Sequence, residues 1–331
     1  MTARLDIIAP YLVTGLLQAG ADLPIARMLA RADAAPSAFT DIDSALVHWF
    51  GIEDWAGVAV LTAGYDFDAA VDSVHWLRAD PVHLRADPTR VILFDADAVG
   101  LDADESDALL AHLNAGLADD ELHFERGSAP TRWYVRLAAP LSLGLASPRA
   151  LRGCSVEDSL DGLRRSGALR RLMTEAQMLL YEAPTNQARA ASGRATINSV
   201  WFWGGGSPSM PRTATGGAVL GDDALLAACA RHAGIDYERE PTGLAALLRE
   251  RSGDVLLLDH HDLETVDLSR FERDILAPAL SALRRGRLAQ VAIHSHQVEL
   301  AFTPAARWRL WRRASRFLAS LRAHSVAQAE T

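Results

Sequence analysis

The segment from Pro184 to Gly206 reads PTNQARAASGRATINSVWFWGGG, and it decides how the rest of the sequence is interpreted. A helix is predicted before it, over residues 168–182, because apolar side chains recur there at helical spacing, and Pro184 is expected to end that helix. After a polar stretch, Val200–Trp203 is predicted to be a buried strand, since β-branched and aromatic residues favour a pleated sheet. The strand runs into three glycines, which leave backbone N–H groups accessible to an anion or to a neighbouring backbone.

The composition is that of an acidic globular protein. The chain has 331 residues, of which 49% are hydrophobic, so it is long enough for one large α/β domain or for a core with an inserted domain. A net charge of −9 argues against general nucleic-acid binding, because phosphate contacts need a basic face. The sequence contains no lysine, which excludes Schiff-base chemistry and a P-loop lysine. No apolar run reaches membrane-spanning length, and we therefore expect a cytoplasmic protein without membrane or nucleic-acid partners.

The pattern of apolar segments predicts an α/β fold. Four segments are predicted to be buried strands: Leu5–Ile8, Trp55–Thr62, Val255–Leu258 and Gln290–Ile293. Strands and helices alternate after Gly206, and such alternation builds a mostly parallel sheet covered by helices on both faces. We therefore expect a three-layer core made of residues 1–85 and 150–331. Residues 86–149, in which a hairpin is predicted, would form a smaller inserted α+β unit.

A second unusual motif, WLRADPVHL, occupies Trp76–Leu84. Its side chains Arg78, Asp80 and His83 are close enough in sequence to meet a phosphate or sugar-acid ligand, with Arg78 as a charge-assisted clamp. The alternative is that Arg78 and Asp80 pair with each other and that His83 is satisfied at the surface. The residues alone favour this second interpretation, and only the family resemblance given below leaves both open.

Polar clusters follow two of the predicted strands. Asp259, His260, His261 and Asp262 come directly after Val255–Leu258, whereas His294 and His296 come at the end of Gln290–Ile293. Ligand sites of doubly wound sheets lie at the carboxyl ends of the strands, and histidine with carboxylate can hold a divalent metal there. The alternative is that these side chains only cap the strand ends.

The two long motifs are similar to those of known families. The order Asn186, Arg189, Gly193, Asn198, Trp203-Gly204 and Gly206 resembles a block of the archaeal-type cofactor-independent phosphoglycerate mutases, which belong to the alkaline phosphatase superfamily. The motif WLRADPVHL, together with SVWFWGGG at Ser199–Gly206, resembles the proteobacterial RpfE-type regulatory proteins, which are phosphoglycerate-mutase-like. The resemblance extends from about Leu23 to about Pro304.

The resemblance implies an alkaline-phosphatase-like core and two sets of site residues. The ligand-binding set comprises Arg78, Asp80, His83, Asn186, Arg189, Arg194, Asn198, Gly204, Gly205 and Gly206. The metal-binding set, for Mn or Zn, comprises Asp259, His260, His261, Asp262, His294 and His296. The sequence departs from the enzymes at three points: Asp6 is not followed by glycine, no serine or threonine nearby has a nucleophile context, and Ile293 replaces an aspartate.

These departures favour a regulatory protein that binds an anionic, phosphorylated small molecule with little or no catalysis and without a cofactor. One alternative is an active metal-dependent phosphomutase or phosphatase with rearranged ligands. The other is a structural interaction protein in which the glycines only permit close packing. The sequence does not indicate which protein, if any, is a partner.

Overall fold

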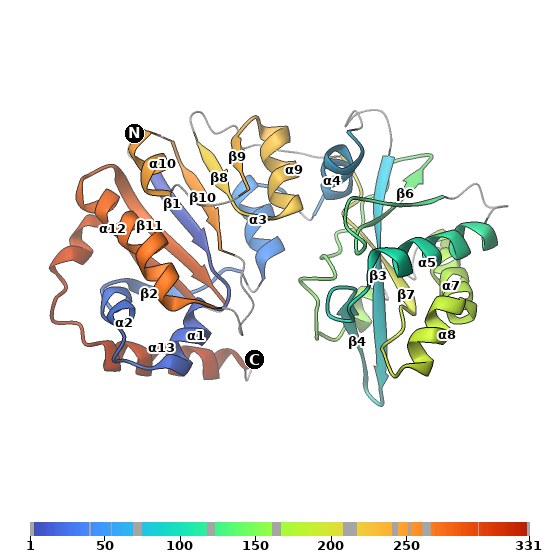
Figure 1. Cartoon of the computed structure of the whole chain (residues 1–331), viewed down its shortest axis with the longest axis horizontal. Helices are drawn as coiled ribbons and strands as arrows, with labels where there is room; N and C mark the ends of the chain where they lie inside the picture. Colours follow the sequence, from blue (N-terminus) through green and yellow to red (C-terminus); the bar gives the residue numbers. More distant parts are fainter. Residues whose placement is uncertain are drawn as a thin grey trace. The chain divides into compact units, whose positions relative to one another are not determined.

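The computed structural model describes residues 3–39, 41–53, 55–68, 75–117, 123–160, 167–207, 217–239, 244–250, 253–259, 266–296 and 298–329. The chain divides into two compact units (Figure 1). Residues 1–49 and 212–331 form the first, called here the α/β unit, and residues 50–211 form the second, called the antiparallel unit. In the described ranges, no helix combines the length and the apolarity needed to cross a bilayer.

The α/β unit is built on a seven-stranded, mostly parallel sheet. The strands in spatial order are β2 (Asp33–Pro36), β12 (Val298–Phe302), β11 (Leu288–Ser295), β1 (Ala3–Ile8), β10 (Val255–Leu258), β8 (Ala218–Leu220) and β9 (Asp236–Glu238). The central strand β1 runs parallel to both β10 and β11, and these three strands lie side by side in Figure 1. β12 is antiparallel to β11 and to β2. The predicted strands near Leu5, Val255 and Gln290 are therefore confirmed as neighbours.

Alternation along β1 gives the two faces of this sheet different roles. Ala3, Leu5 and Ile7 belong to the main hydrophobic core, whereas Arg4 and Asp6 point to the opposite face, because successive side chains of a strand alternate. The core face is covered by apolar residues of α1 (Leu12–Ala19), α2 (Pro24–Leu29), α10 (Leu244–Glu250), α11 (Leu268–Arg270), the π-helix η2 (Phe271–Leu276), α12 (Ala277–Arg284), the 3-10 helix η3 (Pro304–Trp308) and α13 (Ala314–Ala329). The other helices of the unit are α3 (Ile42–Phe50), which ends at the unit boundary, and α9 (Ala224–Ala233).

The antiparallel unit is organised around one long strand. This strand, β3 (His75–Asp87), pairs with β4 (Arg90–Asp95), β6 (Trp133–Leu137) and β7 (Ser199–Trp203), and β6 pairs in turn with β5 (Phe124–Arg126). Its helices with described bounds include α4 (Val58–Phe67), α5 (Ala103–Gly116), α7 (Gly167–Glu182) and α8 (Pro184–Ala191). α7 contacts α5, α8 and β7, so the last three helices form one cluster (Figure 1).

The division into units differs from the one expected from the sequence. Its boundaries fall after residues 49 and 211, whereas the sequence predicts boundaries after residues 85 and 149. The core expected for residues 1–85 and 150–331 would place Val200–Trp203 and Val255–Leu258 in one sheet. This is wrong, because β7 pairs with β3 and β10 pairs with β1. All five residues of β7 are buried. An apolar run of this kind fits any strand covered on both faces, so it does not reveal whether the sheet is parallel.

One local prediction also fails, and a second is incomplete. The segment predicted as a strand at Trp55–Thr62 contributes to helix α4, in which the Thr62 hydroxyl donates to the Val58 carbonyl at 2.9 Å, four residues earlier. Short apolar runs are compatible with a strand or a buried helix, which explains the error. Pro184 begins α8 rather than only ending α7, since proline is tolerated in the first turn, where its missing N–H has no helical partner. Arg189 consequently lies on a helix.

The glycine loop after β7 packs against the start of α4. The carbonyls of Gly204 and Gly205 accept hydrogen bonds from the N–H groups of Ala59 (2.7 Å) and Gly57 (3.1 Å). A Cβ on Gly205 would lie 2.1 Å from the carbonyl oxygen of Leu141. The loop therefore satisfies free N–H groups of a helix N-terminus, and Gly205 permits a close approach between two backbones.

A substitution at Gly205 tests this close approach. We expect Gly205→Ala to lower the free energy of unfolding by about 1–3 kcal/mol, because the added methyl group overlaps the Leu141 backbone and forces a shift. Gly167→Ala is the matched control, since nothing lies within 4 Å of a Cβ built there. Thermal and urea unfolding of both variants would measure the effect, and equal stabilities would contradict the packing role.

Candidate functional site

Arg78 and Asp80 form a closed ion pair inside the antiparallel unit. Two residues apart on β3, they point to the same face, and Arg78 donates to both Asp80 oxygens, with the shortest contact, Nη2 to Oδ2, at 2.7 Å. Asp80 also accepts from Trp203 Nε1 at 2.7 Å and from the Trp133 N–H at 3.1 Å. The guanidinium lies over the rings of Trp203 and Tyr134. The structure thus shows the pair that the sequence left as the alternative.

The two asparagines and the histidine of the predicted ligand-binding set bond to the backbone. Asn186 donates to the Leu180 and Ile197 carbonyls, each at 2.7 Å, and accepts from the Ile197 N–H at 2.9 Å. Asn198 bridges the N–H and the carbonyl of Leu84 at 2.7 and 2.9 Å. His83 Nδ1 lies 2.7 Å from the Thr196 carbonyl. The contacts of Asn198 and His83 fix the segment before β7 against β3, and those of Asn186 fix it against the end of α7.

Arg189 is the most deeply placed of the predicted arginines. Its side chain is fully buried and donates to the Ala195 carbonyl at 2.8 Å, to the Val99 carbonyl and to Glu105. Arg194 binds the other oxygen of the same Glu105 carboxylate, but its own side chain is 47% exposed. Glu105 therefore joins α5 to the end of α8 through two arginines of very different burial.

The predicted metal ligands are only partly within the described residues. His260, His261 and Asp262 lie outside them. β10 and β11 flank β1, so Asp259 and His294 emerge at the same edge of the sheet. There Asp259 pairs with Arg270, and the ring of His296 makes an edge contact with Tyr11. In the described ranges no three such side chains converge on one point, and the metal site stays a prediction.

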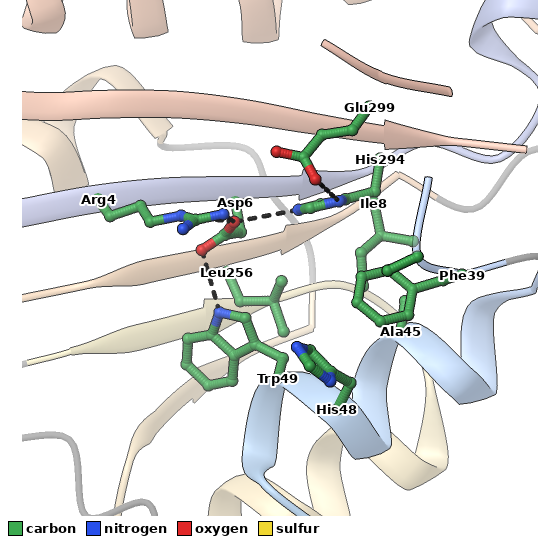
Figure 2. A pocket seen from close by; sticks show the side chains of 11 residues that line it. Arg4, Asp6, Ile8, Phe39, Ala45, His48, Trp49, Leu256, His294 and Glu299 are labelled. Atoms are coloured by element: carbon green, nitrogen blue, oxygen red, sulfur yellow. Dashed lines mark hydrogen bonds and ion pairs between the residues drawn. The ribbon is translucent and has the colours of Figure 1, made fainter. Parts of the chain in front are cut away.

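A cavity of about 310 Å³ opens on the face of the seven-stranded sheet opposite the main core (Figure 2). Strands β1, β10, β11 and β12 supply its floor, and α3 with the segment before it supplies its wall. The lining residues are Arg4, Asp6, Ile8, Ala38, Phe39, Ala45, His48, Trp49, Leu256, His294 and Glu299. Acidic, basic and aromatic side chains therefore line the same cavity.

Asp6 is the centre of the polar network. Its carboxylate is only 5% exposed and accepts from Arg4 Nη2 at 2.8 Å, from Trp49 Nε1 at 3.2 Å and from His294 Nε2 at 3.1 Å. Burial by itself raises the pKa of Asp6. The hydrogen bonds and charges of His294 and Arg4 together lower the pKa by more than burial raises it, so the net pKa lies below the ordinary value. The carboxylate is therefore ionised at neutral pH.

His294 lies between two carboxylates. Its Nε2 faces Asp6 on β1, and its Nδ1 lies 3.7 Å from Glu299 Oε2 on β12, the two strands that flank β11 (Figure 2). That Nδ1 is buried and has no hydrogen-bond partner among the described residues. A buried polar atom without a hydrogen bond costs free energy, so it is a natural anchor for a ligand. The ring of Phe39 lies edge-on to the ring of His294, with the two ring centroids 5.6 Å apart.

The sequence interpretation missed most residues of this cavity. Arg4, His48, Trp49 and Glu299 lie in ordinary helix or strand sequence, with no motif around them. One signal was available: Asp6 is a carboxylate inside the apolar run of β1, and a buried charge in a core strand requires partners.

Comparison with known proteins gave structural similarities only. No protein-family model matches the sequence, and no curated protein matches it. The PH0037 protein of Pyrococcus horikoshii is similar at 15% identity and a TM-score of 0.45, over 91% of this chain and 87% of that one. The cofactor-independent phosphoglycerate mutase of Thermoplasma acidophilum DSM 1728 is similar at 14% identity and a TM-score of 0.43, over 92% and 90% of the chains.

Arg189 and Arg194 allow a matched test of the ion pairs through which Glu105 joins α5 to the end of α8. We expect Arg189→Ala to lower the free energy of unfolding by on the order of 3 kcal/mol or more, because it leaves buried acceptors without a donor. Arg194→Ala removes a half-exposed partner of the same carboxylate and should cost about 0–1 kcal/mol. Urea unfolding compares them, and a small effect at Arg189 would contradict its structural role and favour anion binding by its guanidinium.

The lowered pKa of Asp6 predicts a stability change in acid. A carboxylate whose pKa is lower in the folded state stabilises that state above its ordinary pKa of 3.8, and the contribution is lost as pH falls through the folded value. The wild type should therefore exceed Asp6→Asn in free energy of unfolding at pH 6. This difference should shrink as pH falls below 3.8. Unfolding by urea at several pH values measures it, and parallel curves would contradict the assigned pKa direction.

Proposed function

We propose that this protein is a phosphoglycerate-mutase-like regulatory protein of the RpfE type, which binds a small anionic molecule with little or no catalysis. The cavity around Asp6 and His294 is its binding site. The observation that carries this proposal is the buried Nδ1 of His294, which lies at the floor of a 310 Å³ cavity and has no hydrogen-bond partner among the described residues. That volume is at the lower end of the range of ligand sites, roughly 300–1,000 Å³, and suits a molecule of a few heavy atoms.

The distribution of donors favours an anionic group on the ligand. The Arg4 side chain is 41% exposed at the cavity, so its guanidinium can stay paired with Asp6 and also donate to a ligand oxygen. The exposed imidazole of His48 stands at the wall, 4.7 Å from the ring of Phe39. Arg4 and His48 offer N–H donors, whereas Asp6 is already satisfied by three side chains. His294 donates its Nε2–H to Asp6, so its Nδ1 is left to accept a hydrogen bond, for example from a hydroxyl group of the ligand. Charge-assisted bonds from arginine to phosphate or carboxylate are short and directional.

The described lining of the cavity supports binding rather than phosphoryl transfer. It contains no serine, threonine or cysteine, so a phosphoryl group would have no hydroxyl or thiol acceptor among these residues. The sequence gives the same indication, since Asp6 lacks the following glycine and Ile293 replaces an aspartate. We therefore assign the cavity to holding a ligand and not to transferring part of it, with Asp6 positioning Arg4 and His294 around it.

Binding of a matched pair of acids tests the proposal. We expect 3-phosphoglycerate to bind with saturation in calorimetry, and D-glycerate, which lacks the phosphate, to bind more weakly. Arg4→Gln and His48→Ala should each weaken the binding of 3-phosphoglycerate by about tenfold, the usual size of a lost charge-assisted hydrogen bond. Arg90→Gln, an exposed arginine of the antiparallel unit, is the control and should leave the affinity unchanged.

Two results would overturn parts of this proposal. Absence of binding by a wild type with a normal melting curve, or unchanged affinity in both variants, would remove the cavity as an anion site. Saturable hydrolysis of p-nitrophenyl phosphate that His294→Gln abolishes would show a catalytic site instead.

A further inference from the structure

A second cavity lies on the other face of the same sheet. Its volume is about 240 Å³, and it is enclosed by α2, α12, the end of β12 and η3. Its described lining residues are Met28, Arg31, Ala277, Leu280, Leu283, Arg284, Phe302, Thr303, Pro304, Ala306 and Arg307. None of them lines the cavity around Asp6, so the two sites can be tested separately.

The floor of this second cavity is apolar. Phe302 and Leu283 are almost fully buried, and Met28 and Leu280 pack against them from α2 and α12. Strand alternation explains the placement, because Phe302 and Glu299 are three residues apart on β12 and therefore point to opposite faces. A ligand seated on this floor would need an apolar part.

The rim carries three arginines and no described carboxylate. Arg31, Arg284 and Arg307 come from three separate segments, and none forms an ion pair with a described acidic residue. The nearby carboxylate of Asp33 is already bound by Arg309 at 2.7 Å and by Arg312 at 3.1 Å. Positive charge at this cavity is consequently left for a ligand, in a protein whose net charge is −9.

We propose that this cavity binds an amphipathic monocarboxylate with a short to medium acyl chain. The acyl chain lies on Leu280, Leu283 and Phe302, and the carboxylate lies at the arginine rim. The lining requires both the acyl chain and the carboxylate of the ligand. A wholly polar ligand would bury no apolar surface on the floor, and a wholly apolar ligand would leave the arginine charges unneutralised. The volume, below that of drug-sized ligand sites, limits the length of the chain.

A series of straight-chain acids tests whether the apolar floor binds the acyl chain. Butyrate, hexanoate, octanoate and decanoate are titrated into the full-length protein below their micelle concentrations, with calorimetric detection. Affinity should rise by about fourfold for each methylene that is buried, and it should level off once the cavity is full. Octanol, which keeps the chain and lacks the carboxylate, should bind at least about tenfold more weakly than octanoate.

Variants locate the site. Arg31→Gln and Arg284→Gln should each weaken octanoate binding several-fold, and Leu280→Trp, which fills the cavity, should abolish it. Arg285→Gln is the matched control, since Arg285 is the next residue after Arg284, is exposed and is not among the lining residues. Melting curves establish that each variant is folded.

The titrations decide whether the second cavity holds the acid. Saturable binding with the expected dependence on chain length and on Arg284 supports the proposal. It is overturned if the folded wild type binds no acid, if affinity is independent of chain length, or if all three site variants bind like the control. Attachment to anionic phospholipid vesicles without binding of soluble acids would also overturn it, because the arginines would then serve a lipid surface.

Discussion

A carboxylate inside a sheet must be hydrogen-bonded, and this constraint determines the surroundings of both central strands. An ionised group removed from water without partners costs several kcal/mol or more. In β3, Asp80 is satisfied by Arg78 and by donors from Trp203 and Trp133. In β1, the carboxylate of Asp6 is satisfied by Arg4, Trp49 and His294. In each unit the buried carboxylate thereby joins elements that are far apart in the sequence.

The two networks differ in what they leave open. Arg78 and Asp80 are each at most 5% exposed, and tryptophan and tyrosine rings surround the pair, so this network stabilises the antiparallel sheet. The Asp6 network opens on a cavity, and its last member, His294, retains one ring nitrogen without a hydrogen bond among the described residues. The same chemical requirement thus produces a structural crosslink in one unit and a candidate ligand site in the other.

The two-residue period of a strand also explains how one sheet can serve two sites. Along β12, Glu299 faces the Asp6 cavity, whereas Phe302 forms part of the floor of the second cavity. The polar cavity has donors for a small anion, and the second has an apolar floor with an arginine rim. Because the sheet separates them, a ligand in one cavity leaves the other accessible, and the affinities can be measured independently.

The sequence by itself determined the parallel strands and one local pair. The apolar runs of β1 and β10 identify buried strands from neighbouring residues alone, and the spacing of Arg78 and Asp80 places both on one face of any strand. The glycines of the loop after β7 signalled a close backbone approach, but not the partners, which are Leu141 and the start of α4. Only the tertiary structure decided that β7 pairs with β3 and that Trp49 and His294 reach Asp6. Those residues are 43 and 288 positions away from it in the chain. Local periodicity carries no record of such distant contacts, because the folding of the whole unit creates them.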